Sequence, residues 1–138
     1  MMDNDEANRI EIIKEYPFPW PHEEIGYNLF PQSLENDELV AFHGTARENL
    51  QPIMEVGFKF ARTLQSLSFA KESAFALPFA CRARSEASPE GCVIAVRFKP
   101  PLQRAGITVE PGVIHVFNLQ EKPEVIGYCI VPADYDFR

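Results

Sequence analysis

The spacing of the apolar residues changes once along the chain, and this change constrains the fold most. Before residue 85, two segments carry helical spacing: one places Leu50, Ile53 and Met54 on one face, and the other runs from Lys71 to Arg84. After residue 91 the apolar runs are short and are separated by prolines and glycines; the predicted strands are Cys92–Phe98, Ile107–Val109, Val113–Phe117 and Val125–Val131. Helices first and strands afterwards predict an α+β domain rather than alternating βαβ units.

The length and composition are those of one domain. The chain has 138 residues, 46% of them hydrophobic and 12% aromatic, which is enough for a core without metal or disulfide support. We predict a single domain over residues 1–138, with an N-terminal extension (1–37), rich in proline and aromatic residues at Tyr16–Pro21, and a core (38–132). The net charge of −7 disfavours nucleic acid and anionic membranes as partners but allows a small anionic ligand.

The three cysteines predict reduced thiols rather than a disulfide framework. Cys81, Cys92 and Cys129 are widely spaced, and the last two lie within apolar runs. Together with the three scattered histidines they show no spacing suited to zinc, so we expect no metal. The N-terminus lacks the features of a signal peptide, and no apolar run approaches the ~20 residues of a membrane span. We therefore expect a soluble, cytoplasmic protein.

A polar motif follows the first buried strand. Leu39–His43 reads as a strand that ends at Gly44, and Thr45-Ala-Arg-Glu48 has the form of a capping box that starts a helix. Gly57 supplies the predicted end of that helix. His43 is thus expected where a strand meets a helix N-terminus.

A second short strand, Leu67–Ala70, precedes the helix over 71–84. Ala74, Phe75, Leu77 and Phe79 are expected to pack inward, and Pro78 to kink or break the helix. Ser68 is open to two interpretations, a cap of this helix or a functional hydroxyl. We interpret Phe69 and Phe79 as core residues and His115, which lies among apolar residues of a predicted strand, as structural.

These two motifs together carry a family resemblance. Phe42-His43-Gly44-Thr45, followed by Leu67-Ser68-Phe69-Ala70 and Ser73-Ala74, resembles the ADP-ribosyltransferase superfamily, in the branch with a histidine in its first motif. That branch includes poly-ADP-ribose polymerases, diphtheria toxin and rifampin ADP-ribosyltransferase. The resemblance covers about residues 38–132 and implies a split β-sheet core with two main helices.

The resemblance also implies a function, the cleavage of NAD at its nicotinamide glycosidic bond with transfer of ADP-ribose to an acceptor or to water. His43, Ser68 and Glu110 would be catalytic: His43 would bind a ribose hydroxyl, and Glu110 would stabilise the oxocarbenium-like transition state. The Gly44 backbone would clamp the nicotinamide carboxamide. The implied NAD-binding residues are His43, Gly44, Thr45, Phe69, Ser73, Arg47 and Arg62, and the candidates for the pyrophosphate are Arg47, Arg62, Lys71 and Arg82.

The sequence departs from the family pattern at two positions. Ser68 stands where the family has a tyrosine that stacks on nicotinamide. Glu110 precedes the strand that should carry the acidic residue, a strict register gives Val113 there, and Glu124 is a weaker candidate. Three alternatives therefore stay open: a catalytically silent module that binds NAD, ADP-ribose or a protein partner; a relative of the RNA 2′-phosphotransferases; and an unrelated α+β interaction domain.

Overall fold

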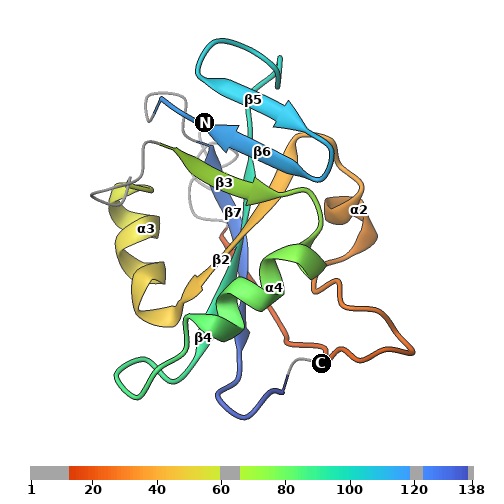
Figure 1. Cartoon of the computed structure of the whole chain (residues 1–138), viewed down its shortest axis with the longest axis vertical. Coiled ribbons are helices and arrows are strands. Elements are labelled where there is room, and N and C mark those ends of the chain that lie inside the picture. Colours follow the sequence, from red (N-terminus) through yellow and green to blue (C-terminus); the bar gives the residue numbers. More distant parts are fainter. Residues whose placement is uncertain (1–12, 60–65, 119–122, 137–138) are drawn as a thin grey trace, which may run out of the picture.

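The computed structural model describes residues 13–59, 66–118 and 123–136. Within these ranges the chain forms a seven-stranded sheet with a few short helices, which confirms the predicted α+β class (Figure 1). The elements are β1 (Lys14–Tyr16), α2 (Gln32–Glu35), β2 (Val40–Ala46), the 3-10 turn η1 (Arg47–Asn49), α3 (Leu50–Val56), β3 (Leu67–Ala70), α4 (Ser73–Arg82), β4 (Gly91–Arg97), β5 (Ile107–Glu110), β6 (Val113–Val116) and β7 (Glu124–Val131).

The sheet is nearly divided between β2 and β3. The strand order is β1-β7-β4-β2-β3-β6-β5, and all neighbours are antiparallel except β1 and β7. β2 pairs with β4 at seven consecutive positions, Val40 to Ala46, but with β3 only at Phe42, which faces Ala70. Figure 1 shows β3, β6 and β5 lying together beyond β2, with α4 crossing in front of β2 and β4. A short gap in the backbone ladder therefore lies beside the second half of β2.

Apolar residues are buried in two clusters. One contains Phe42 of β2 and Ala76, Leu77 and Ala80 of α4, and the other contains Phe69 of β3 with Phe58 after α3. Because successive side chains of a strand point to opposite faces, β2 contributes Phe42 to one cluster and Ala41 to the other. α4 packs directly on β2 and β4.

The described part of the predicted extension is built into this core. Lys14–Tyr16 forms an edge strand on β7, and Leu29 and Phe30 are buried with Phe42 and α4. The Tyr135 hydroxyl, beyond β7, donates a hydrogen bond of 2.8 Å to the Pro21 carbonyl. Residues 13–37 thus pack as part of the domain rather than outside it.

The predicted strand end and capping box at residues 43–48 are wrong. β2 continues through Gly44 and Thr45 to Ala46, because all three residues pair with β4. Thr45 caps no helix; its Oγ1 accepts a hydrogen bond of 2.9 Å from the Asn49 side chain. η1 intervenes and α3 starts at Leu50, whereas the predicted end at Gly57 is confirmed by a φ of 94° there.

The second helix is placed correctly, but two of its residues face outward. α4 continues past Pro78 to Arg82. Leu77 is buried as predicted, whereas Phe75 and Phe79 are 59% and 58% exposed. The prediction that these two phenylalanines pack inward is therefore wrong. The four late strands agree with β4 to β7 within two residues at each end.

The prediction of free thiols is confirmed. All three cysteines are unpaired, and Cys92 and Cys129 are buried in β4 and β7. Burial raises the pKa of both thiols to about 12, so neither is a thiolate at neutral pH.

Candidate functional site

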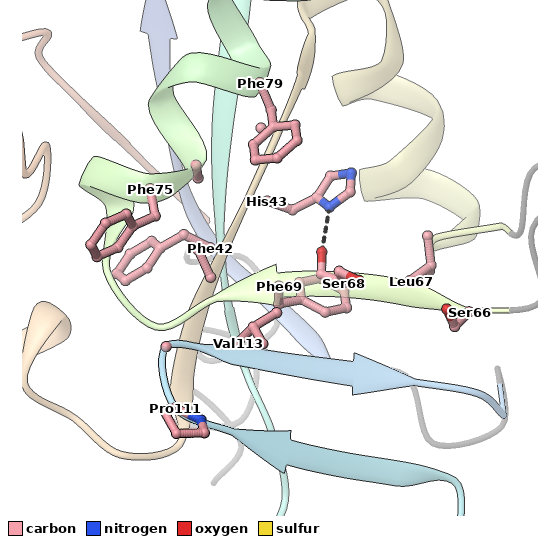
Figure 2. A pocket seen from close by; sticks show the side chains of 14 residues that line it. Phe42, His43, Ser66, Leu67, Ser68, Phe69, Phe75, Phe79, Pro111 and Val113 are labelled. Carbon is pink, nitrogen blue, oxygen red and sulfur yellow. Dashed lines mark hydrogen bonds between the residues drawn. The ribbon is translucent and has the colours of Figure 1, made fainter.

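A pocket of about 600 Å³ lies where β2 and β3 part (Figure 2). Its walls come from the middle of β2, from β3, from the outward face of α4 and from the turn between β5 and β6. The lining residues are Phe42, His43, Gly44, Ser66, Leu67, Ser68, Phe69, Ala70, Phe75, Ala76, Phe79, Pro111, Gly112 and Val113. The two sequence motifs, far apart in the chain, therefore meet at one pocket.

The backbone of Gly44 faces this pocket. Leu39 accepts a hydrogen bond from Phe98, and Arg47 donates one to Glu90, so odd-numbered residues of this stretch bond across to the β4 side. In an antiparallel pair the intervening residues direct both N–H and C=O the other way. The Val40 carbonyl does so, since it accepts a hydrogen bond from Lys71. The N–H and C=O of Gly44 consequently point toward β3, beyond the single position at which β3 pairs with β2.

Gly44 has no side chain, and this allows α4 to pack closely on β2. A Cβ built there would lie 2.1 Å from the Ala76 carbonyl oxygen and 2.8 Å from the Ala80 nitrogen of α4. No real Cβ tolerates such contacts with backbone atoms. The sequence prediction assigned the glycine to close approach of a ligand, but the close approach visible here is that of α4.

His43 joins the two sides of the gap. Its Nδ1 lies 3.1 Å from the Ser68 carbonyl oxygen, and because a carbonyl only accepts, Nδ1 carries the proton. The ring packs against Phe58 and Phe69 at centroid distances of 5.3 and 5.5 Å. Burial lowers the pKa of His43, partly offset by the Ser68 carbonyl. The imidazole is therefore neutral near pH 7, with Nε2 as a hydrogen-bond acceptor.

Aromatic rings form one wall. Phe75 and Phe79 project from α4 over the pocket in Figure 2, and both are more than half exposed. The Arg82 guanidinium lies 5.3 Å from the centroid of the Phe79 ring. Exposed aromatic rings beside a concave surface can contact a flat ligand. The sequence predicts that both rings pack inward, but the buried face of α4 is formed by Ser73, Ala76, Leu77 and Ala80.

A polar row leads away from Ser68 across the smaller half of the sheet. Ser68 faces His115 across the β3–β6 pair, and its Oγ lies 2.9 Å from His115 Nδ1. On the other side of the ring, His115 Nε2 lies 3.8 Å from a carboxylate oxygen of Glu110. The prediction of a structural His115 rests on its apolar neighbours in the strand. The residue that faces His115 depends on strand register, which one strand alone does not reveal.

The other predicted site residues lie elsewhere. Thr45 and Arg47 do not line the pocket, and Arg47 forms an ion pair with Glu90. Ser73 is fully buried, with its N–H 3.0 Å from a carboxylate oxygen of Glu35. Glu110 does not line the pocket, although it precedes Pro111, which does. Arg62 lies outside the described residues.

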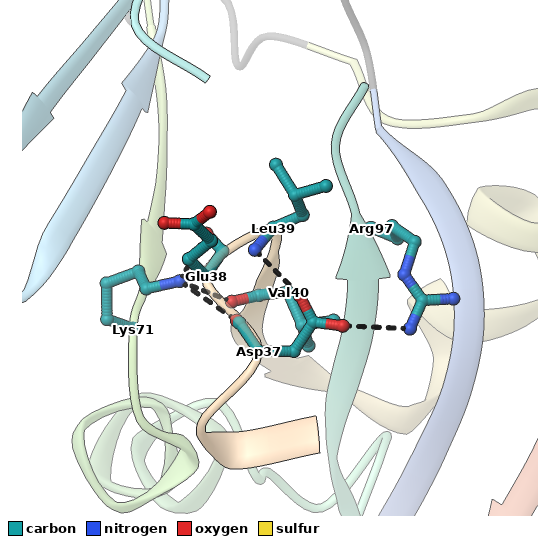
Figure 3. A network of polar contacts seen from close by, with 6 residues as sticks. All are labelled: Asp37, Glu38, Leu39, Val40, Lys71 and Arg97. Atoms are coloured by element: carbon teal, nitrogen blue, oxygen red, sulfur yellow. Dashed lines mark hydrogen bonds and ion pairs between the residues drawn. The ribbon is translucent and has the colours of Figure 1, made fainter. Parts of the chain in front are cut away.

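Lys71 and Glu124 also have other roles or places. The Lys71 ammonium donates to the carbonyls of Asp37, Glu38 and Val40, at 3.3, 2.8 and 2.8 Å, and so braces the start of β2 (Figure 3). Asp37 in turn pairs with Arg97 at 3.2 Å. Glu124, the weaker acidic candidate, opens β7 opposite Arg97. Arg82, another predicted pyrophosphate ligand, lies beside Phe79, which lines the pocket.

The chain matches no protein-family model, and no curated protein is significantly similar to it in sequence. Within the described ranges, no cluster of histidine, cysteine and acidic side chains is suited to hold a metal ion. In the same ranges no helix has the length and apolar character needed to cross a bilayer.

Proposed function

We propose that this chain is an ADP-ribosyltransferase-type domain that binds NAD, with the nicotinamide end in the pocket between β2 and β3, and cleaves its glycosidic bond. The observation that carries the proposal is the orientation of the Gly44 backbone, whose N–H and C=O face that pocket next to a neutral His43. A primary carboxamide offers a matching acceptor and donor. The near division of the sheet at β2 and β3 supports the split-sheet fold that the motifs imply.

The aromatic wall supports the same ligand. Ser68 leaves no ring at the position of the family tyrosine, but Phe75 and Phe79 present exposed rings to the pocket from α4. A flat pyridine ring gains from contact with such surfaces. Arg82, beside Phe79, adds positive charge close to the pocket, which suits an anionic dinucleotide.

The carboxamide match is tested without any mutation. NAD is compared with nicotinic acid adenine dinucleotide, in which a carboxylate replaces the carboxamide and so has no N–H for the Gly44 carbonyl. We expect at least ~10-fold weaker binding of the carboxylate analogue by calorimetry. The Gly44 carbonyl would lose its hydrogen-bond donor and face a carboxylate oxygen, and this costs more than about 1.4 kcal/mol. Equal affinities would contradict the assigned role of Gly44.

The aromatic wall is tested by Phe79→Ala. We expect about tenfold weaker NAD binding, equivalent to roughly 1.4 kcal/mol of lost ring contact. Trp20→Ala is the matched control, since Trp20 is also an exposed aromatic residue, 51% accessible, and does not line the pocket. An equal loss in both variants would argue against a nicotinamide site on α4.

Turnover is followed as release of free nicotinamide. One observation favours a second candidate, a module that binds NAD or ADP-ribose without turnover: none of the described residues lining the pocket is a carboxylate. Saturable binding without nicotinamide release would select that candidate.

The free thiols fit a reducing compartment, and we include a cytoplasmic location in the proposal.

A further inference from the structure

Resting on the proposed function, we propose that Ser68 is a nucleophile that accepts ADP-ribose from bound NAD, with His115 as its base and Glu110 as the carboxylate that orients His115. The chain would then modify itself at a serine in its own pocket. The three side chains form a hydroxyl–imidazole–carboxylate series.

Strand pairing brings the three side chains to one face of the sheet. Ser68 and His115 are directly opposite in the β3–β6 pair, and Glu110 is opposite Val113, two residues before His115. Directly paired residues, and residues two apart on a strand, share a face. The Ser68 carbonyl accepts a hydrogen bond from His43 on the β2 side, so the backbone of Ser68 points away from β6. Ser68 and His115 therefore form a non-hydrogen-bonded pair, the type in which facing side chains lie closest together. The 2.9 Å contact follows from this register.

The charges set the direction of proton transfer. A carboxylate 3.8 Å from Nε2 favours the tautomer with the proton on that nitrogen. Nδ1 then has a free lone pair and accepts the Ser68 hydroxyl proton. Ser68 lines the pocket and is therefore the member of the series next to the ligand site. The side chains of His115 and Glu110, behind it, are 27% and 56% exposed.

The step balances without any further reactant. The Ser68 oxygen forms a bond to the anomeric carbon of the nicotinamide ribose as the bond from that carbon to the pyridinium nitrogen breaks. The bonding pair stays on the ring nitrogen and neutralises it, so neutral nicotinamide leaves. The serine proton passes to His115 Nδ1, and Glu110 stabilises the imidazolium.

The experiment measures the protein itself. Wild-type chain is incubated with NAD, acid-quenched at times from seconds to hours, and analysed by intact mass and peptide mapping. We expect one ADP-ribosyl group per chain, located on Ser68. Ser68→Ala should give no adduct, and Ser68→Cys, which keeps a nucleophile, should restore it. His115→Gln should slow the reaction by about 100-fold or more, the typical range of a general base.

Two controls separate chemistry from folding. Thr108→Val alters the residue opposite His115 on β5, on the same face and outside the series, and should leave the rate within about twofold. Melting temperatures of all variants are measured in parallel, and Glu110→Gln serves as a second, exposed test of the series. Glu110→Gln is expected to lower the rate by roughly tenfold, as loss of the group that orients an imidazole does.

The outcomes distinguish this proposal from the function on which it rests. Nicotinamide release without an adduct on Ser68, or an unchanged rate in His115→Gln, overturns the nucleophile and leaves the proposed function standing. An undetectable affinity for NAD overturns both. An adduct on Ser68 that depends on His115 supports both.

Discussion

At the scale of single residues, His43 couples the pocket to pH. Its folded-state pKa lies below the ordinary value of 6.5 because the ring is desolvated, so the folded chain binds fewer protons than the unfolded chain just below that pH. The stability from a neutral His43 is fully present above about pH 6.5 and is lost as pH falls through the lowered pKa.

We therefore expect the melting temperature to fall between pH 7.5 and 5.5 more steeply in wild type than in His43→Gln. The difference between the two proteins isolates His43 from other titrating groups. His22→Gln alters an exposed histidine and should leave the wild-type slope unchanged. Parallel slopes for wild type and His43→Gln would show that the imidazole is not desolvated.

Glu35 and Ser73 form a buried polar pair that fixes the start of α4. The Glu35 carboxylate accepts hydrogen bonds from the Phe30 and Ser73 N–H groups, at 3.2 and 3.0 Å, and from the Ser73 hydroxyl. Glu35→Ala leaves both buried N–H groups unpaired and should cost about 2–5 kcal/mol of unfolding free energy by urea denaturation. Glu38→Ala, at an exposed carboxylate nearby, should change it by less than about 0.5 kcal/mol. Similar losses of unfolding free energy in Glu35→Ala and Glu38→Ala would show that the hydrogen bonds between Glu35 and Ser73 do not stabilise the fold.

At the scale of elements, the sequence predicted what local pattern determines. The late strands and the end of α3 follow from apolar runs and from Gly57. The capping signal at Thr45 failed because the pairing of Gly44, Thr45 and Ala46 with β4 outweighs a local cap. The residues brought to the pocket were predicted in part: His43, Gly44 and Ser68 meet there, whereas the link from Ser68 to His115 required the register of β6.

The contact of α4 with β2 gives a prediction at this scale. Gly44→Ala forces a methyl group against the Ala76 carbonyl, so α4 must shift away from the sheet. We expect a loss above roughly 3 kcal/mol, or no folded protein, in thermal melts. Gly112→Ala is the matched control: its φ is 80° and nothing lies within 4 Å of an added Cβ, so only backbone strain of about 1–2 kcal/mol applies. Equal losses of stability in Gly44→Ala and Gly112→Ala would mean that backbone strain, rather than contact with α4, destabilises both variants.

At the scale of the whole molecule, the segment before β2 closes the core that α4 and β2 begin. Phe30 stacks on Phe42 with ring centroids 5.0 Å apart, and Tyr16 packs edge-on against Phe30 at 5.1 Å. Glu35 holds the first turn of α4, and α4 carries one wall of the pocket. The pocket at the split of the sheet thus depends on residues that precede the predicted core of residues 38–132.

A chain that begins at Glu38 should therefore fail to fold cooperatively, even though it keeps all of residues 38–132. It loses the buried Leu29 and Phe30, worth about 1.5–3 kcal/mol each, together with the Glu35 contacts, against a total stability of roughly 5–15 kcal/mol for a domain. Circular dichroism melts should show a broad transition or none. Ile25→Ser is the control, because Ile25 lies in the same segment but is 62% exposed and should leave the melt unchanged. A sharp transition in the shortened chain would instead show that the core without residues 1–37 folds alone and that the N-terminal segment only covers it.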